Sequence, residues 1–325
     1  MELLYLSRAD VTRLGVTMAE VLDAVDEGFC LKGLGKTETP PKPGIHPRPD
    51  CFTNAMLAYV GGIEAAGVKW VSAYPSNPPA GLPFISGLVL LDDPATGVPL
   101  AVMDAVWPTA MRTGASAGIA ARYLAPTHSV VAAIVGCGVQ NRHSVMALAE
   151  VLPDLREVRC YDLFSQAADA FRAEMEQRFP TLSFVLCESA AAAVRPAEVV
   201  VTAVPTVADP HPDLDAGVLK EGALAVSLDY GSAWTPAAMR ACDRFFCDDV
   251  EQVLAVKRAG HHLRGIPERI DGDLGALAAG RMAGREGAAQ RIFCLNLGIA
   301  VEDVVTAKLL YDRALAEGVG ARLPL

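Results

Sequence analysis

The sequence lacks a long uninterrupted apolar stretch, a basic N-terminal region and an excess of positive charge. No run approaches the ~20 apolar residues of a membrane-spanning helix. Residues 1–8 have neither the basic region nor the cleavage site of a secretory signal peptide. The formal net charge of −10 argues against a nucleic-acid partner, because such proteins need basic patches. These absences predict a cytoplasmic protein with no membrane or nucleic-acid partner.

Metal-ligand spacing is also missing. The six histidines are scattered, apart from the neighbours His261 and His262, so no metal site is predicted. Of the eight cysteines, four lie in or beside predicted buried strands: Cys137, Cys160, Cys187 and Cys247. Small hydrophobic residues in a reduced cytosol explain them, and a redox role for Cys137 is the alternative.

The composition provides for a substantial core. The chain has 325 residues, which favours two domains, and 52% are hydrophobic against 20% charged. From residue 130 onward, short apolar runs alternate with helical patterns, which predicts an α/β fold with a doubly wound, mostly parallel sheet. Residues 52–91 contain short β-prone runs broken by glycine, and these predict an antiparallel sheet. Residues 301–316 predict a last, amphipathic helix.

Residues 130–162 combine the features of a dinucleotide-binding βαβ unit. An apolar run is followed by a glycine-rich turn, a helical pattern and a second strand that ends at Asp162. Gly136 permits a tight turn, Gly138 allows a diphosphate to approach the backbone, and the helix N-terminus favours the anion. Asp162 suits the ribose hydroxyls, so NAD is favoured over NADP.

The match to this fingerprint is partial. Asn141 stands at the third position, which is usually Gly or Ala. Arg142 or Arg159 could tolerate the additional phosphate of NADP, so NADP stays possible. The alternative interpretation of the glycines is an ordinary strand-to-helix turn.

Ligands of such a sheet bind beyond the carboxyl ends of its strands. Three groups of residues follow predicted strands there: residues 202–204 with Ala203, Asp229, and the pair Asp248 and Asp249. Asp229 directly follows an apolar run, and a carboxylate at a strand tip beside a dinucleotide is placed to act as an acid or base. An aspartate that caps a turn is the alternative, because Gly and Ser follow closely.

Two cationic residues, Lys69 and Arg112, are candidates for binding an anionic substrate. Lys69 projects from a predicted strand, on the face opposite Val68 and Trp70, and a solvated lysine is the alternative. Arg112 lies near the start of a predicted helix rich in small residues, 111–125, where a cation is disfavoured. Binding a substrate carboxylate beside the helix N–H groups would explain that position, and a surface ion pair is the alternative.

Residues 36–50 are rich in proline and cannot be helical. This segment also holds Lys42 and Arg48. A proline-stiffened segment with basic groups could shape an anion pocket, and a surface connector is the alternative.

Taken together, these segments resemble the ornithine cyclodeaminase/μ-crystallin family over nearly the whole chain. The most specific segments are 67–69, 111–125, 136–140, the strand ending at Asp229, and 293–303 with Asn296, Gly298 and Asp303. The resemblance implies a homodimer. It also implies a substrate-binding and dimerisation domain, residues 1–112 completed by 299–325, and an NAD-binding Rossmann domain, residues 113–298.

The resemblance also implies roles for individual residues. Lys69 and Arg112 would bind the substrate carboxylate or polarise the reacting centre, and Asp229 would be the acid/base. The substrate-binding residues expected are Lys69, Arg112, Lys42 and Asn54. The cofactor-binding residues expected are Gly136, Gly138, Val139, Gln140, Asp162, Thr113, Ala203 and Asn296.

The chain departs from the family at two points. Ornithine cyclodeaminases carry a glutamate on the strand before the lysine motif, and Asn54 stands there in this sequence. Because asparagine cannot act as a base, this argues against ornithine cyclisation. The family's early arginine has no clear match, and Lys42 or Arg48 is the candidate to replace it.

We therefore expect an NAD(P)-dependent oxidoreductase that acts on the Cα–N bond of an amino acid or its imine. The first alternative is a cyclodeaminase that uses NAD as an internal oxidant and releases ammonia. The second is a non-catalytic, crystallin-like NAD(P)-binding protein. The pocket for the substrate side chain is expected near residues 52–58, 74–84 and the loop with His261 and His262.

Overall fold

The computed structural model describes residues 1–206, 211–260, 263 and 265–325. The chain forms two compact units. The first unit comprises Met1–Arg112 and Ile299–Leu325, and the second comprises Thr113–Gly298. Each unit is built around its own β-sheet.

The sheet of the first unit is mixed. Its strands are β1 (Glu2–Leu6), β2 (Thr37–Glu38), β3 (Gly44–Ile45), β4 (Phe52–Val60), β5 (Ala65–Ala73), β6 (Ile85–Asp92), β7 (Pro99–Asp104) and β16 (Ala321–Pro324). They follow the order β16-β1-β7-β6-β5-β4-β2, with β3 also paired to β4. β1 runs parallel to β7, whereas β4, β5, β6 and β7 pair antiparallel, as the glycine-broken runs of residues 52–91 predicted.

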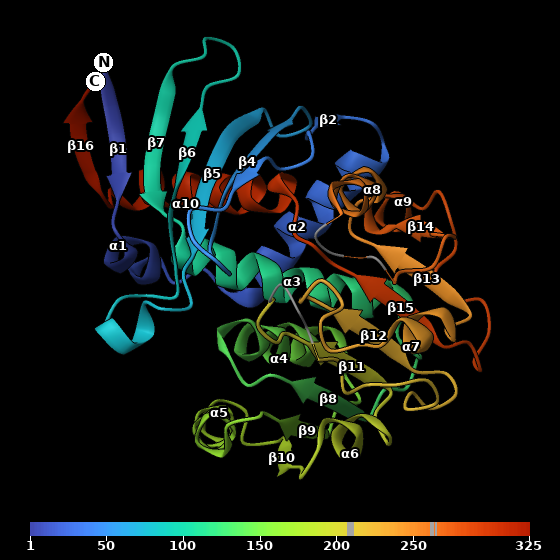
Figure 1. Ribbon diagram of the computed structural model, residues 1–325. Helices are drawn as coiled ribbons and strands as arrows, with labels where there is room; N and C mark the ends of the chain where they lie inside the picture. Colours follow the sequence, from blue (N-terminus) through green and yellow to red (C-terminus); the bar gives the residue numbers. More distant parts are fainter. Residues whose placement is uncertain (207–210, 261–262, 264) are drawn as a thin grey trace. The chain divides into compact units, whose positions relative to one another are not determined.

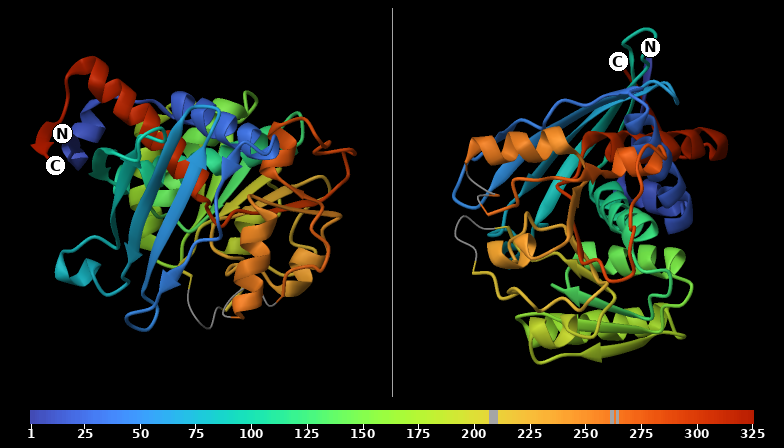
Figure 2. Two further views of the ribbon diagram at one scale, coloured as in Figure 1. Left: turned by 90° about the horizontal axis from the view of Figure 1, so that it is seen from above. Right: turned by 90° about the vertical axis from the view of Figure 1, so that its right-hand side faces the viewer.

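Two long helices of the first unit cover one face of this sheet (Figures 1 and 2). They are α2 (Met18–Gly33) and α10 (Ala300–Glu317), which contact each other, and α10 also contacts β4, β5 and β6. The sequence predicts α2 from a capping box, and the structure confirms it, because Thr17 accepts from Glu20 N and Glu20 from Thr17 N. The unit also contains the shorter helix α1 (Arg8–Arg13) and the 3₁₀ turn η1 (Pro78–Ala80).

Helix α3 (Val106–Leu124) begins five residues before the predicted helix 111–125. The prediction that Arg112 lies near a helix start is therefore wrong. Proline is compatible with the first turn of a helix, so Pro108 does not delay the start, and Asp104 Oδ1 accepts from Val106 N at 3.0 Å. Arg112 lies in the second turn, where the free N–H groups of the helix start are no longer beside it.

The sheet of the second unit is parallel throughout. Its strands are β8 (Val131–Val135), β9 (Glu157–Tyr161), β10 (Ser183–Leu186), β11 (Val199–Thr202), β12 (Leu224–Ser227), β13 (Arg244–Cys247), β14 (Gly272–Asp273) and β15 (Ile292–Leu295). They follow the order β10-β9-β8-β11-β12-β15-β13-β14. The first five places repeat the doubly wound dinucleotide-binding order, and β15 lies between β12 and β13. The predicted Rossmann-type α/β fold is confirmed.

Helices lie on both faces of this parallel sheet (Figure 2). Besides the later part of α3, they are α4 (Val139–Val151), α5 (Ser165–Arg178), α6 (Ala190–Val194), α7 (Pro236–Arg240), α8 (Val250–Ala259) and α9 (Leu274–Ala278). Gly114 of α3 lies so close to α4 that an added Cβ would be 2.5 Å from the carbonyl oxygen of His143. Glycine at this position of α3 thus permits close contact between the two helices. None of the described helices is long and apolar enough to cross a membrane.

Candidate active site

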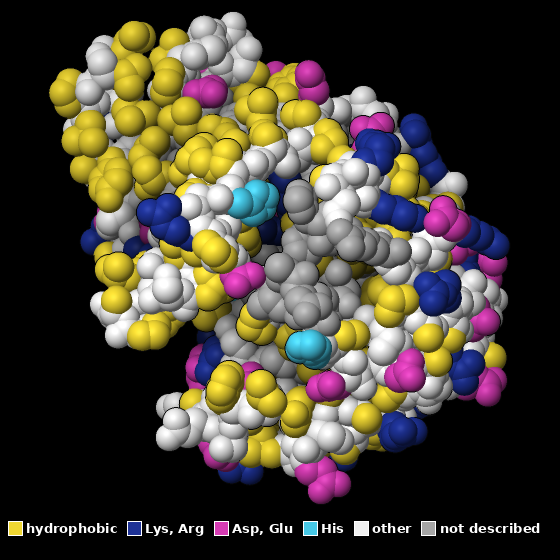
Figure 3. All heavy atoms as spheres, in the orientation of Figure 1, with side chains coloured by type: hydrophobic (Ala, Val, Ile, Leu, Met, Phe, Trp, Pro, Cys, Tyr) yellow, Lys and Arg dark blue, Asp and Glu magenta, His cyan; other side chains and the backbone are white. Residues whose placement is uncertain are grey.

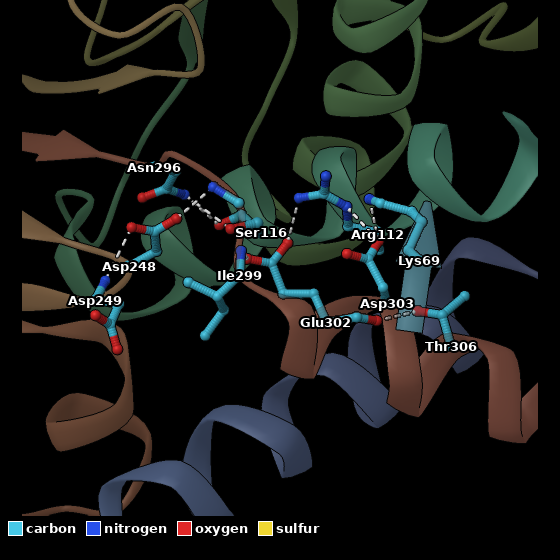
Figure 4. A network of polar contacts seen from close by, with 11 residues as sticks. Lys69, Arg112, Ser116, Asp248, Asp249, Asn296, Ile299, Glu302, Asp303 and Thr306 are labelled. Carbon is cyan, nitrogen blue, oxygen red and sulfur yellow. Dashed lines mark hydrogen bonds and ion pairs between the residues drawn. The ribbon is translucent and has the colours of Figure 1, made fainter. Parts of the chain in front are cut away.

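In the first unit, Lys69 is fully buried in an ionic cluster. It lies on β5 with 0% of its side chain exposed, on the opposite face of the sheet from Trp70, which is 52% exposed. The Lys69 Nζ atom donates to Asp303 Oδ1 of α10 at 2.5 Å (Figure 4). The alternative of a solvated lysine is therefore excluded, and the buried ammonium lies beside a buried carboxylate.

Arg112 joins the same cluster. Its Nη1 atom donates to Glu302 Oε2 at 2.8 Å, and its Nε atom lies 3.0 Å from Asp303 Oδ1 (Figure 4). The second contact is an ion pair rather than a hydrogen bond, because the N–H is poorly aligned with the oxygen. A single carboxylate oxygen is thus shared by an ammonium and a guanidinium, and the alternative of a surface ion pair for Arg112 is excluded.

The cluster contains two cations and two carboxylates, so its formal charges balance. Burial, together with the positive charge of Arg112, lowers the pKa of Lys69 to about 7, although Asp303 and Glu302 oppose the shift. Burial likewise raises the pKa of Glu302, while the charge of Arg112 opposes that shift. Lys69 is therefore poised to change its charge near neutral pH.

The sequence draws attention to Lys69 and Arg112 but gives no role to the two acids. Asp303 stands out only as part of the family-like segment 293–303, and Glu302 does not stand out at all. Both lie in the first turn of α10, where acidic residues are common because they stabilise the helix N-terminus. Their position in the sequence therefore carries no signal that they face two cations.

Asn54 and Lys42, the other two expected substrate-binding residues, also belong to the first unit. Asn54 of β4 is paired with Val71, one diagonal step from Lys69 and on the same face of the sheet. Lys42 is half-buried in the irregular segment between β2 and β3. Asn54 thus points to the face that carries Lys69, whereas Lys42 lies outside regular structure.

In the second unit, the glycine-rich turn between β8 and α4 is tied to the acid at the tip of β9. Asp162 Oδ2 accepts from Cys137 N at 2.7 Å, and its Oδ1 accepts from Phe164 N at 2.9 Å. Gly136 has φ 88°, and a Cβ there would be 2.5 Å from the carbonyl oxygen of Ala203. The backbone of the turn therefore requires glycine at position 136, whether or not a cofactor is bound.

The first turn of α4 has the features of a site for an anionic ligand. A Cβ added to Gly138 would meet nothing within 4 Å, and Val139 is 56% exposed. Gly138 is the N-cap of α4 and offers no side-chain acceptor, so no N-cap side chain accepts from the first N–H groups of the helix. Nearby, Gln140 Oε1 and Thr113 Oγ1 are buried without a hydrogen-bond partner in the described part of the chain. These features fit a bound dinucleotide.

Asn141, the departure from the usual fingerprint, has a structural role. It is 0% exposed, and its Nδ2 atom donates to the carbonyl oxygens of Val135 at 3.0 Å and Gly136 at 2.7 Å. A glycine or alanine could not make these bonds. The side chain holds the end of β8 and the start of the turn together.

The two arginines that might accept the additional phosphate of NADP have partners within the chain. Arg142 pairs with Glu174 at 2.7 Å, donates to the carbonyl oxygen of Cys137 and lies over the ring of Phe171. Arg159 pairs with Glu157 at 2.8 Å. The carboxylate of Asp162 therefore dominates the charge at the tip of β9, which favours NAD.

The remaining expected cofactor contacts lie at the same end of the parallel sheet. Ala203 directly follows β11, and Asn296 directly follows β15. The Asn296 Nδ2 atom donates to Ser116 Oγ at 2.9 Å and to the Ser116 carbonyl oxygen at 3.2 Å (Figure 4). Asn296 thus connects β15 to α3 within the second unit.

Asp229 lies two residues beyond the end of β12 and is 1% exposed. Its Oδ1 atom accepts from Ser227 Oγ at 2.6 Å, and its Oδ2 atom accepts from Val204 N at 3.3 Å. Burial raises the pKa of the Asp229 carboxyl, whereas the hydrogen bonds from Ser227, Val204 and Thr202 lower it. An exposed turn aspartate would not have these surroundings.

Cys137 is inert in the thiol form. It is 2% exposed, and burial, together with the charge of Asp162, raises the pKa of its thiol to about 12. Because the thiolate is the reactive form, packing explains this cysteine better than a redox role. His261 and His262, expected near the substrate pocket, lie outside the described residues.

Known proteins are similar to this chain over nearly its whole length. The model of the ornithine cyclodeaminase/mu-crystallin family matches residues 1–318. The alanine dehydrogenase of Archaeoglobus fulgidus is 35% identical over 333 residues, covering 99% of this chain and 98% of the relative.

Two solved structures are similar in fold and in sequence. The structure of the Δ¹-pyrroline-2-carboxylate reductase of Thermococcus litoralis with NADH and L-proline has a TM-score of 0.88 at 32% identity, covering 98% of this chain and 99% of that chain. An archaeal alanine dehydrogenase dimer with bound NAD has a TM-score of 0.85 at 33% identity, with 100% of both chains covered. The predicted resemblance is confirmed: this chain belongs to the ornithine cyclodeaminase/mu-crystallin family, and its relatives in that family include NAD-dependent amino acid dehydrogenases and imine reductases.

Proposed function

We propose that this protein is an NAD(H)-dependent oxidoreductase that acts on the Cα–N bond of an amino acid or its imine. The observation that carries the proposal is the shared oxygen of Asp303, which lies 2.5 Å from Lys69 Nζ and 3.0 Å from Arg112 Nε. An ammonium and a guanidinium so arranged are suited to a carboxylate. The relatives that bind NAD or NADH and act on alanine or Δ¹-pyrroline-2-carboxylate support the same conclusion.

Lys69 and Arg112 are proposed to orient the substrate through its α-carboxylate. The ammonium of Lys69 carries three N–H groups, and its bond to Asp303 uses one of them. Asn54, on the same face of the sheet, and Lys42 are the proposed further substrate contacts. Fixing the carboxylate fixes the position of Cα, and orientation of this kind supplies on the order of 7–11 kcal/mol in favourable cases.

The glycine-rich turn is proposed to hold the cofactor. Gly136, Gly138, Val139 and Gln140 would surround the diphosphate, and Asp162 would accept from the ribose hydroxyls. The other proposed cofactor contacts are Thr113, Ala203 and Asn296. The bound cofactor would supply the hydride chemistry, and these residues would hold and orient it.

Asp229 is proposed to exchange the proton that accompanies the hydride. Loss of a hydride from Cα and a proton from nitrogen turns an amine into an imine, and the reverse transfers reduce it. A carboxylate that takes or returns the nitrogen proton contributes about 10²–10⁴-fold to such a step. Lys69, with its pKa lowered to about 7, is the second proposed acid/base group.

Turnover assays distinguish this proposal from the two alternatives. The oxidoreductase predicts a sustained change in NADH absorbance when amino acids or cyclic imines are supplied with NAD or NADH. Ammonia release from a diamino acid with catalytic NAD and no lasting absorbance change would instead indicate a cyclodeaminase. NAD binding without any turnover would indicate a crystallin-like protein.

We also propose that the chain forms a homodimer through the open face of the first unit's sheet. Leu57, Trp70 and Leu88 on that face are 52%, 52% and 48% exposed, and hydrophobic side chains gather over this sheet in Figure 3. Trp70 and Leu88 are directly paired across β5 and β6, so they form one continuous patch. The similar archaeal alanine dehydrogenase is a dimer.

Light scattering at increasing protein concentration tests the dimer. Trp70→Glu should give a monomer, because a charge in the centre of an apolar interface is costly. Leu254→Glu on α8, where Leu254 is 37% exposed, is the control and should keep the wild-type mass. A monomeric wild type, or an unchanged mass for Trp70→Glu, would contradict the dimer.

The two units then have distinct proposed roles. Residues 1–112 with 299–325 bind the substrate and form the dimer, and residues 113–298 bind NAD. We further propose that the protein works in the cytoplasm, since all eight of its cysteines are unpaired, as is usual in a reducing compartment.

A further inference from the structure

Two buried hydroxyl groups lie side by side at the carboxyl ends of β11 and β12. Thr202 and Ser227 are register partners of these parallel strands, and both are 0% exposed. Neither hydroxyl is needed by the sheet, whose hydrogen bonds use backbone atoms alone. Buried hydroxyls in a strand of apolar neighbours require partners, and these partners determine which way each O–H points.

Each of the two hydroxyls accepts from a group that can only donate. Gly231 N donates to Ser227 Oγ at 2.9 Å, and Trp234 Nε1 donates to Thr202 Oγ1 at 3.0 Å. A backbone or indole N–H has no lone pair to offer in return. The hydroxyl hydrogens of Ser227 and Thr202 are therefore available to other acceptors.

For Ser227 that acceptor is the carboxylate of Asp229. Ser227 Oγ donates to Asp229 Oδ1 at 2.6 Å, and Val204 N donates to Asp229 Oδ2 at 3.3 Å. The hydroxyl of Thr202, on the neighbouring strand, also lowers the pKa of this carboxyl. These polar groups stabilise the ionised form of Asp229.

The backbone after Asp229 is shaped to complete this arrangement. Tyr230 has φ 57° and Gly231 has φ 74°, so two successive residues are left-handed. This conformation is unfavourable for tyrosine, and it returns the N–H of Gly231 to Ser227. The strained backbone thus places the N–H of Gly231 where it donates to the Ser227 hydroxyl, which in turn holds Asp229.

We propose that Thr202, Ser227 and Trp234 are positioning residues that favour the ionised form of Asp229 in the resting protein, with one oxygen fixed by Ser227. The inference rests on the proposed role of Asp229 as acid/base. It adds which direction of the reaction, amine oxidation or imine reduction, the resting protein is ready for. A carboxylate held by donors is ready to accept a proton, so the resting protein is prepared for amine oxidation. Imine reduction requires that Asp229 first be protonated.

The groups that act on this carboxyl in the described structure are uncharged. β11 contributes Thr202, β12 contributes Ser227, and the turn that follows contributes Trp234, while Tyr230 is the adjacent titratable side chain. Burial is the largest influence and raises the pKa of Asp229 overall, whereas the hydrogen bonds limit that rise. Removing one donor should therefore raise the pKa of Asp229 further.

The test compares Ser227→Ala and Thr202→Val with the conservative variants Ser227→Thr and Thr202→Ser. The rate of amino acid oxidation is measured against pH, and the carboxyl ¹³C resonance of Asp229 is titrated, assigned by its loss in Asp229→Asn. A hydrogen bond to a charged group is worth about one pKa unit or slightly more. Ser227→Ala and Thr202→Val should therefore raise the pKa of Asp229, and the acid limb of kcat/KM, by about one unit.

The conservative variants should stay near the wild type, and Trp234→Phe should give a smaller shift in the same direction because it frees Thr202 to rotate. Unshifted titrations in Ser227→Ala and Thr202→Val, with only the melting temperature lowered, would overturn the inference. Full turnover by Asp229→Asn would instead remove the proposed acid/base role, and the ¹³C titration would still decide whether the hydroxyls hold the carboxylate ionised.

Discussion

The Nζ atom of Lys69 lies 2.5 Å from Oδ1 of Asp303, although the two residues are 234 positions apart in the sequence. Both side chains are fully buried, and Arg112 lies beside them with its Nε atom 3.0 Å from the same oxygen. Asp303 thereby connects a strand from the first part of the chain to the last helix. The first unit depends on this contact for both its packing and its proposed substrate site.

Asp303→Asn should destabilise the protein strongly. The substitution leaves two buried cations with only Glu302 to balance them, and breaking a buried pair in this way costs about 3–5 kcal/mol. Urea unfolding measures the loss. The matched control is Asp312→Asn on the same helix, where Asp312 pairs with Lys308 at 2.5 Å but is 55% exposed, so that its loss should cost about 0–1 kcal/mol. Equal effects of the two substitutions would contradict the buried-pair argument.

The affinity for the amino acid should fall as the pH rises above about 7. The pKa of Lys69 is lowered to about 7, chiefly by burial, so that the ammonium exists below this pH and the neutral amine above it. Only the ammonium attracts the substrate carboxylate. KM measured from pH 6 to 9 should therefore rise at alkaline pH.

Lys69→Arg provides the control for this titration, because a guanidinium stays charged throughout the range. The variant should bind the amino acid less well, since its geometry differs, but its KM should not rise over the same pH interval. A KM that rises equally in both proteins would assign the pH dependence to the substrate or to another group.

Much of the second unit could be predicted from the sequence, for a physical reason. Parallel strands in the middle of a sheet are buried on both faces, so they appear as short continuous apolar runs, as residues 131–135, 199–202 and 224–227 do. The strand β16 was missed, because all four of its residues are exposed and pairing with β1 alone defines it. Such a strand has no hydrophobic pattern to detect.

The candidate site was predictable only where a residue type is unusual for its place. A lysine in a strand and an acid at a strand tip stand out, and both Lys69 and Asp229 proved to be buried. Thr202 and Ser227 do not stand out, since threonine and serine are tolerated in strands. Their importance arises from the register of β11 with β12, which is a property of the folded sheet.

Asp162→Asn should weaken NAD binding more than NADP binding. The carboxylate is the charged acceptor proposed for the ribose hydroxyls, and hydrogen bonds to charged groups are worth about 1.5–3 kcal/mol, or roughly 10–100-fold in affinity. A neutral amide also no longer repels the additional phosphate of NADP. The kcat/KM with NAD divided by the kcat/KM with NADP should therefore fall. The control is Asp169→Asn on α5, where Asp169 is 60% exposed, and it should leave this ratio unchanged.

Alanine substitutions at Gly136 and Gly138 should separate folding from cofactor binding. At Gly136 the added Cβ would lie 2.5 Å from the carbonyl oxygen of Ala203 and φ is 88°, so Gly136→Ala should lower the melting temperature markedly. At Gly138 the Cβ meets nothing within 4 Å, so Gly138→Ala should keep the melting temperature of the wild type. Because that open space is where the diphosphate is proposed to approach the backbone, Gly138→Ala should still weaken NADH binding at least tenfold, an effect of about 1.4 kcal/mol or more. Fluorescence titration with NADH, alongside thermal unfolding, measures both properties, and undiminished NADH binding by Gly138→Ala would place the diphosphate elsewhere.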